Sequence, residues 1–170
     1  VYKRQLHVFS NASAFRMHPH VPLIVADVNP EALDASSGQA LHACATNCTL
    51  IPILHPLSVL SQNYTITKVV ARSEQALSGA GWKLLHNQEL KTRAIDQEIP
   101  GEAEKIVEEI ERILDLNAEW DVKTKRVDER DGHIVHVEVH VDNTPTFDMV
   151  ASLLQSEEQT LALPSQPTHS

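Results

Sequence analysis

The sequence predicts a fold of the α+β class, and three patterns support this prediction. Residues 21–28 form an apolar run bounded by prolines, which is typical of a buried strand in a parallel sheet. Residues 100–114 place apolar side chains on one face of a helix, whereas residues 133–142 alternate valine with polar side chains. The chain should therefore combine buried strands, an amphipathic helix and a strand with one solvated face.

The composition fits a soluble globular protein. The chain has 170 residues, of which 42% are hydrophobic, and a net charge of −9, so it can bury the core of one domain. No apolar run reaches the roughly 20 residues of a membrane span. The acidic balance argues against nucleic acid as a partner. Two cysteines four positions apart make neither a disulfide framework nor a complete zinc site, which favours a cytoplasmic setting.

The remaining elements follow from caps, turns and periodicity. A helix should begin at Thr46 or Asn47, since both can cap it and Pro52 would fall in its first turn. Thr144 or Thr146 should lead into the last helix, whereas the polar tail has no pattern of its own. The other expected elements are a strand at 65–73, a turn at 78–81, a helix at 100–114, and strands at 118–128 and 133–142.

Cys48 is the strongest candidate for a reactive nucleophile. A thiol at a helix N-terminus is favoured as thiolate by unpaired backbone N–H groups and by the helix dipole. The alternative is that Cys48 is simply buried, as free cysteines usually are. Cys44, inside the apolar stretch LHACA, is expected to be structural.

Ten histidines compete for the role of partner base. His136 and His140 share one strand face with Glu138, while His133 points to the other face, so the three histidines cannot converge simply on a metal. Solvated strand surface is the expected role of His136 and His140. His133 differs, because it follows Asp131-Gly132 at the start of a strand, where a turn can present a side chain to a cleft.

The order of several segments resembles the aspartate-β-semialdehyde dehydrogenases. ATNCTL is followed 26 residues after the cysteine by EQALSGAG, then by the helix GEAEKIVEEIERIL and by RVDERDGH. The segment SNASAFRMHPHVPLIVADVNPEAL also looks like the part of that family that precedes its catalytic cysteine. The resemblance runs from about Phe9 to about Leu154.

The resemblance implies catalytic roles for four residues. Cys48 would form a thioester with the acyl group, and Asn47 would help to stabilise the oxyanion. His133 would act as general acid and base, and Gln75 would orient the substrate near the thiol. The implied reaction is reduction of aspartyl 4-phosphate by NADPH, on the biosynthetic route to lysine, threonine and methionine.

Further residues would bind substrate and cofactor. Arg126 would clamp the substrate carboxylate, and Glu109 would meet its amino group. Arg112, which stands where the family usually has lysine, and Arg16 would bind phosphate. The resemblance also implies a small loop without bulky side chains against the nicotinamide of NADP. This loop consists of Ser78, Gly79, Ala80 and Gly81.

The resemblance implies a glyceraldehyde-3-phosphate-dehydrogenase-like catalytic and dimerisation domain with a mixed, largely antiparallel sheet. Residues 1–46 would be the end of a nucleotide-binding Rossmann domain, and residues 47–170 an incomplete catalytic domain. No glycine-rich nucleotide-binding turn is present in the sequence, and VYKRQ matches nothing in the family. The chain is therefore expected to be an internal fragment of a longer, homodimeric enzyme, inactive by itself.

Two alternatives remain. N-acetyl-γ-glutamyl-phosphate reductases share this chemistry and the SGAG turn, but they typically have glycine before the cysteine and tyrosine after it, where this chain has Asn47 and Thr49. The other alternative is a non-catalytic dimerisation or binding module of the same fold, in which Cys48 would be incidental.

Overall fold

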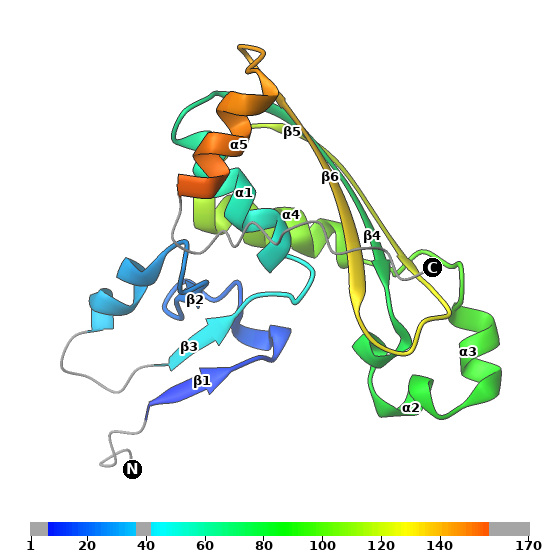
Figure 1. Ribbon diagram of the computed structural model, residues 1–170. Coiled ribbons are helices and arrows are strands. Elements are labelled where there is room, and N and C mark those ends of the chain that lie inside the picture. The colour runs from blue at the N-terminus through cyan, green and yellow to red at the C-terminus, as the bar shows by residue number, and fades with distance from the viewer. Residues whose placement is uncertain (1–6, 37–41, 157–170) are drawn as a thin grey trace.

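The computed structural model describes residues 7–36 and 42–156, which form two three-stranded sheets connected by helices (Figure 1). The first sheet is entirely parallel, with strand order β1-β3-β2. The second has strand order β5-β4-β6, in which β4 is parallel to β5 and antiparallel to β6. The strands are β1 (Val8–Ser10), β2 (Leu23–Ile24), β3 (His42–Ala45), β4 (Ile66–Gln75), β5 (Glu119–Arg126) and β6 (His133–Val141).

The predicted α+β class and mixed sheet are confirmed, although the second sheet has one pair of each orientation rather than mostly antiparallel pairs. The strand expected at 21–28 is parallel as predicted but pairs only over Leu23–Ile24.

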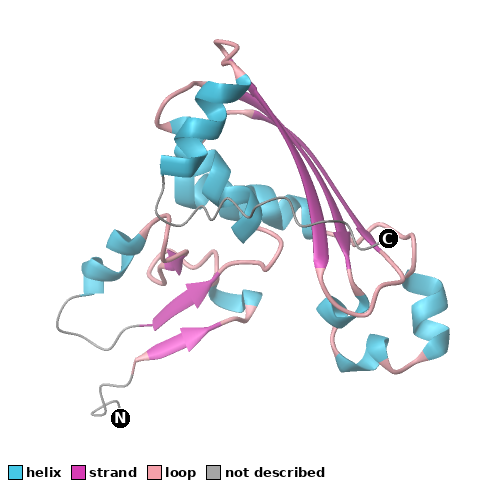
Figure 2. Cartoon of the chain, viewed as in Figure 1, coloured by secondary structure: helices cyan, strands magenta, loops and turns pink. Residues whose placement is uncertain are grey.

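The helices lie between and beside the two sheets (Figure 2). They are α1 (Ile51–Ser61), α2 (Trp82–Leu85), α3 (Gln88–Ala94), α4 (Glu102–Leu114) and α5 (Phe147–Ser156), with short 3-10 turns η1 (Ser13–Phe15), η2 (Pro30–Ser36) and η3 (Leu77–Ala80).

The main core lies where α1 and α4 pack on one face of the second sheet. Apolar side chains from both helices and from β4 are fully buried there, and each contributes about 1.5–3 kcal/mol by leaving water. The valines of β6 lie partly buried at the edge of this core, while the alternate positions His136, Glu138 and His140 are exposed, as predicted. The fully buried members are Leu50, Ile53, Leu54, Leu57, Val69, Ile106 and Ile110.

The outer face of the second sheet is charged. Arg72 of β4 pairs with Asp121 of β5, and two further ion pairs, Lys68–Glu119 at 2.6 Å and Glu74–Lys125 at 2.7 Å, join the same two strands. His140 contacts Glu138 at 2.8 Å. Within residues 7–36 and 42–156, no group of three histidine, cysteine or acidic side chains is arranged to hold a metal ion.

The first long helix begins later than its sequence pattern predicts. The side chain of Asn47 accepts a hydrogen bond from the Thr49 N–H at 2.9 Å, and its carbonyl accepts one from the Leu50 N–H at 3.0 Å. These bonds fix a turn at 48–50, and α1 starts only at Ile51, with Pro52 in its first turn as expected. Cys48 therefore lies in the turn that precedes the helix and not in the first turn of the helix.

The segment between the SGAG turn and α4 had no predicted structure, and it forms α2 and α3 beside one end of the second sheet (Figure 1). Asn87 caps α3 by accepting the Leu90 N–H. Thr146 accepts the Met149 N–H at the start of α5, which confirms it as the residue leading into that helix. The expectations for VYKRQ and for the polar tail lie outside the described residues.

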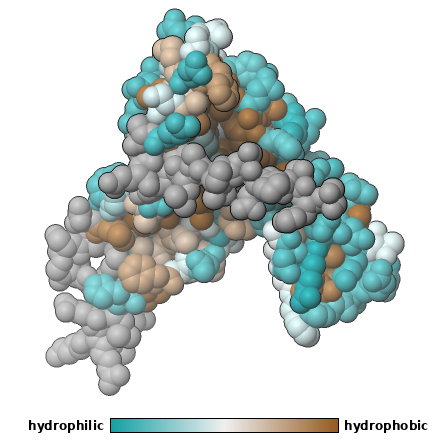
Figure 3. Space-filling model, viewed as in Figure 1, coloured by the Kyte–Doolittle hydropathy of each residue, from teal (hydrophilic) through white to brown (hydrophobic). Residues whose placement is uncertain are grey.

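The hydropathy of the surface differs between the regions of the two sheets. The lobe with α2 and α3 is mainly hydrophilic in Figure 3, whereas hydrophobic side chains gather over the region of β1 and β3. Phe9 of β1 is 71% exposed there. In the described part of the chain, none of the helices has the length and apolar character needed to cross a bilayer.

Candidate active site

Cys48 and His133 come together although 85 positions separate them in the sequence. The Sγ atom of Cys48 lies 3.4 Å from Nε2 of His133. Cys48 is exposed, whereas Cys44 is 1% exposed inside β3, as predicted for a structural cysteine. An exposed thiol beside an imidazole nitrogen is the arrangement in which a base can activate a nucleophile.

The other nitrogen of His133 is held by the backbone. Nδ1 lies 2.9 Å from the carbonyl of Gly132. The Ala76 N–H is shared between two acceptors, since it lies 3.2 Å from Nδ1 and 3.2 Å from the Gly132 carbonyl. When Nδ1 carries a proton and donates it to the Gly132 carbonyl, Nε2 is free to accept the proton of Cys48. The orientation of this imidazole therefore suits a general base.

Strand register brings two more predicted residues to the same place. Gln75, the last residue of β4, pairs with Arg126 of β5 on one side and with His133 of β6 on the other. The three side chains thus come from adjacent strands at one end of the sheet. Gln75 is 2% exposed and Arg126 is 6% exposed, so the floor of the site is polar and largely shielded from water.

One hydrogen bond positions the side chain of Arg126, and its other N–H donors remain unpaired among the described residues. Its Nη1 donates to the carbonyl of Ala76 at 2.7 Å, and its other guanidinium donors have no hydrogen-bond partner among the described residues. Burial lowers the pKa of the Arg126 guanidinium from its ordinary value, while the nearby Glu102 carboxylate and Cys48 oppose that shift. Arginine remains charged because its pKa is so high, which gives the site a buried cation next to the thiol.

Gly79 allows this arrangement. A Cβ at position 79 would lie 2.9 Å from Cε1 of His133, closer than real Cβ contacts come, and 3.0 Å from Nη1 of Arg126, which is tighter than nine in ten of them. Gly81 follows with φ of +83°, a conformation that favours glycine. The SGAG turn is anchored by hydrogen bonds from Leu77 and Ser78 N–H groups to the loop that precedes His133.

Asn47 joins the site through a carboxylate that the sequence did not single out. Nδ2 of Asn47 donates to Oε1 of Glu102 at 2.7 Å, and Nε2 of Gln75 donates to the same oxygen at 3.4 Å. Glu102 is the first residue of α4 and is partly exposed. The helix dipole is sufficient to explain an acid at that position, so no pattern in the sequence points separately to its contacts in the site.

Glu109 is buried, and both of its carboxylate oxygens accept hydrogen bonds within the protein. Oε1 accepts a hydrogen bond from Arg16 at 3.0 Å, and Oε2 accepts one from the backbone N–H of Asn47 at 2.7 Å. Arg16 also donates to the carbonyl of Asn11 at 2.8 Å. Glu109 and Arg16 thus support the turn that carries Cys48.

Arg112 lies apart from the thiol and binds backbone. It donates to the carbonyls of Arg16, His18 and Val21, the last at 2.8 Å. These bonds connect α4 to the segment before β2. The predicted residues therefore divide into a group around the thiol (Cys48, His133, Gln75, Arg126, Asn47 and the SGAG turn) and a supporting group (Glu109, Arg16 and Arg112).

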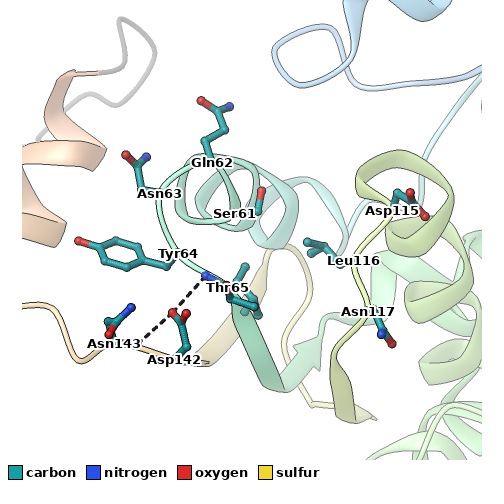
Figure 4. A pocket seen from close by; sticks show the side chains of 11 residues that line it. Ser61, Gln62, Asn63, Tyr64, Thr65, Asp115, Leu116, Asn117, Asp142 and Asn143 are labelled. Carbon is teal, nitrogen blue, oxygen red and sulfur yellow. Dashed lines mark hydrogen bonds between the residues drawn. The ribbon is translucent and has the colours of Figure 1, made fainter.

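A separate pocket of about 570 Å³ lies at the opposite end of β4, between the ends of α1 and α4 and the turn before α5 (Figure 4). Tyr64, Asp115, Asn117 and Asp142 are among its lining residues, and Asp142 accepts the Thr65 N–H at 3.3 Å. None of the residues grouped around Cys48 lines it.

A thiol beside an imidazole is an arrangement that enzymes with a nucleophilic cysteine use, and comparison with known proteins specifies the family. No protein-family model matches the chain. Aspartate-semialdehyde dehydrogenase of Aspergillus fumigatus is 32% identical over 97% of this chain and 52% of its own length. The chain belongs to the aspartate-semialdehyde dehydrogenase family, and it spans about half the length of the curated relatives it matches.

Solved structures of that family share the fold. The aspartate semialdehyde dehydrogenase II of Vibrio cholerae superposes with a TM-score of 0.76 at 23% identity, covering 96% of this chain and 58% of that one. The enzyme of Candida albicans, solved with NADP, gives a TM-score of 0.73 at 23% identity, over 89% of this chain and 49% of that one. The relatives are oxidoreductases by name, and their architecture is the one predicted.

Proposed function

We propose that this chain carries the catalytic residues of an NADP-dependent aspartate-semialdehyde dehydrogenase, which reduces L-aspartyl 4-phosphate to aspartate 4-semialdehyde and phosphate. The observation that carries the proposal is the 3.4 Å contact between Cys48 and His133 beside the buried guanidinium of Arg126. We assign residues 1–46 to the end of a nucleotide-binding domain and residues 47–170 to the catalytic domain. The complete enzyme would be a homodimer that serves lysine, threonine and methionine biosynthesis.

The first step is acyl transfer to sulfur. Nε2 of His133 accepts the thiol proton, and the Cys48 thiolate attacks the acyl carbon of the substrate. A C–S bond forms, and the bond from carbon to the phosphate oxygen breaks, so that phosphate leaves with the electron pair. Asn47 donates only one amide hydrogen to Glu102, and its second can stabilise the developing oxyanion.

Arg126 supplies the charge that orients the substrate. Its unpaired donors can hold a carboxylate in a bidentate manner. Both predicted phosphate ligands make contacts within the protein: Arg112 donates to three backbone carbonyls, and Arg16 donates to Glu109 and to the Asn11 carbonyl. The phosphate-binding roles of Arg16 and Arg112 therefore rest on the family resemblance, and in this structure both side chains support the site.

The SGAG turn fits a flat cofactor ring. Gly79 and Ala80 are exposed, and a Cβ added at Gly81 would meet nothing within 4 Å, so the backbone beside His133 is open to close approach. NADPH, when bound, would supply the hydride that reduces the thioester carbonyl. The aldehyde carbonyl forms as the C–S bond breaks, and His133 returns its proton to the departing sulfur, so that the semialdehyde leaves and the Cys48 thiol is regenerated. The Candida albicans structure with NADP supports this choice of cofactor.

Selective alkylation tests the proposal. Cys48 is exposed and Cys44 is buried, so a difference between the two cysteines alone is not informative. The informative comparison is between variants. His133→Asn should slow labelling of Cys48 by iodoacetamide below neutral pH by about tenfold or more, because the base that takes the thiol proton is lost. His136→Asn, on the exposed face of the same strand, is the control and should leave the rate unchanged. Equal rates in both variants would favour a non-catalytic module in which Cys48 is incidental.

A further inference from the structure

We propose that the hydroxyl groups of Thr49, Ser73 and Thr124 hold one buried water molecule between the turn that carries Cys48 and the second sheet. The inference goes beyond the proposed function and does not depend on it, because it concerns the interior beneath the candidate active site and not a step of the reaction. The ligand of this site is water, and neither substrate nor cofactor reaches it.

The three hydroxyl groups are buried without a partner. Thr49, Ser73 and Thr124 are 0%, 3% and 2% exposed, and their hydroxyl oxygens form no hydrogen bond with residues 7–36 and 42–156. A buried polar group that has lost its bonds to water without gaining others costs free energy. In native proteins such groups are satisfied by a protein atom or by an ordered water molecule. Each of the three hydroxyl groups therefore requires a partner.

Ser73 and Thr124 lie opposite each other on neighbouring strands. They are register partners in the parallel pair β4–β5, two residues before the partners Gln75 and Arg126. Residues two positions apart in a strand share a face, so both hydroxyl groups lie on the face that carries the floor of the candidate active site. The peptide carbonyls of paired strands point along the ladder within the sheet. They are thus directed away from side chains on this face.

The turn at 48–50 crosses the same face of the sheet. Asn47, which precedes the turn, donates to the same carboxylate oxygen as Gln75. Leu50, which ends the turn, lies in the same buried cluster as the apolar side chains of β4 that precede Ser73. The turn therefore runs along β4 in the reverse direction, and Thr49 is placed opposite Ser73. The third hydroxyl group approaches the other two from the side of the turn.

One water molecule suits these three groups. Buried waters typically make about three hydrogen bonds to polar groups that lack other partners. A hydroxyl group can both donate and accept, so three of them can satisfy both hydrogens and one lone pair of a water molecule. The three groups carry no charge, whereas a buried ion needs a compensating charge. The chemistry of the site therefore favours water over an ion.

Nuclear Overhauser effects between water and backbone amides test the proposal in the ¹⁵N-labelled chain. The amides of Ser73 and Thr124 should show cross-peaks with water. Ala71 and Val122, which form the preceding apolar pair on the same face, are the internal control and should show none. Thr124→Val should remove the cross-peak at Ser73, because the water loses one of its three partners. Thr124→Ser keeps the hydroxyl group and should retain it.

Urea unfolding of Thr124→Val provides the second readout. Valine has the shape of threonine without its hydroxyl group, so a hydroxyl group that binds water should be missed, and the unfolding equilibrium constant should rise about tenfold. A fall in that constant would show that the hydroxyl group has no partner in the native state and would overturn the proposal. Absence of the water cross-peak from Ser73 in the unmodified chain, or its persistence in Thr124→Val, would overturn it as well.

Discussion

At the scale of single residues, the site depends on close contacts that only particular side chains allow. His133 reaches Cys48 because Gly79 has no side chain, since a Cβ there would overlap both the imidazole and the guanidinium of Arg126. The same glycine therefore positions the proposed base and the proposed carboxylate ligand. A change of one carbon atom at this position should affect reactivity more than the fold.

Gly79→Ala should slow alkylation of Cys48 by roughly ten- to a hundredfold, because small displacements of a catalytic group have large effects on rate. The overpacking should cost about 1–3 kcal/mol of stability. Mass spectrometry of labelled protein measures the first effect, and urea unfolding measures the second. Unchanged labelling in a folded Gly79→Ala variant would contradict the contact with His133.

The sequence predicted which side chains gather around the thiol better than it predicted the contacts that support them. Strand register brings Gln75, Arg126 and His133 together, and His133 contacts Cys48. Glu102 was missed because an acid in the first turn of a helix already has a sufficient explanation in the dipole. The phosphate role of Arg112 came from the family resemblance, and the sequence contains no signal for the three backbone carbonyls that Arg112 contacts in the fold.

At the scale of elements, α4 is the support of the site. It contacts β5 of the second sheet and β2 of the first, and it presents Glu102 and Glu109 toward the turn that carries Cys48. The sequence placed this helix within two residues of its observed start but expected its acidic face to be solvated. Glu109 departs from that expectation because Arg16 and the Asn47 N–H satisfy its charge.

Glu109→Gln should lower the free energy of unfolding by about 2 kcal/mol, because the change removes the charge that compensates Arg16 and weakens the bond to Asn47. Urea denaturation gives the measurement. Glu108→Gln is the control, since Glu108 is exposed on the same helix, and it should change stability by less than about 0.5 kcal/mol. Equal effects of the two substitutions would refute a supporting role for Glu109.

The parallel pair β4–β5 is joined by charges on the outer face of the sheet. A hydrogen bond from Arg72 lowers the pKa of Asp121 below its ordinary value of 3.8. The stabilisation from this pair is therefore present above the unfolded pKa and is lost as pH falls through the lowered pKa. Arg72→Ala should return the pKa of Asp121 toward 3.8. NMR titration of the carboxyl carbon tests this, and an unchanged titration would mean that Arg72 does not pair with Asp121 in solution.

At the scale of the whole molecule, Arg112 connects the two sheets. Its bonds to three carbonyls attach α4, which packs on the second sheet, to the segment that leads into β2 of the first. A planar guanidinium suits several acceptors at once, and a lysine would not reproduce that geometry. The two sheets should therefore unfold together as long as this connection is intact.

Arg112→Ala should reduce stability by about 2–3 kcal/mol, since several charge-assisted hydrogen bonds are lost. It should also expose residues 16–21 to proteolysis before the second sheet unfolds. Arg93→Ala, which breaks an exposed pair with Glu89, is the control and should cost less than about 1 kcal/mol. Identical cleavage of both variants would show that Arg112 does not hold the two sheets together.

The proposed function requires that Cys48 attack the carbonyl carbon of an aspartyl substrate with His133 as its base. ¹³C NMR of aspartate semialdehyde, labelled at the aldehyde carbon and mixed with the chain, tests this step. Addition of the thiol forms a C–S bond and transfers the thiol proton to the carbonyl oxygen, which requires no cofactor. We expect a protein-dependent signal of a tetrahedral carbon, distinct from that of the free hydrate, which is absent in Cys48→Ser and weakened in His133→Asn. Persistence of that signal in Cys48→Ser, or its absence from the unmodified chain, would contradict the account.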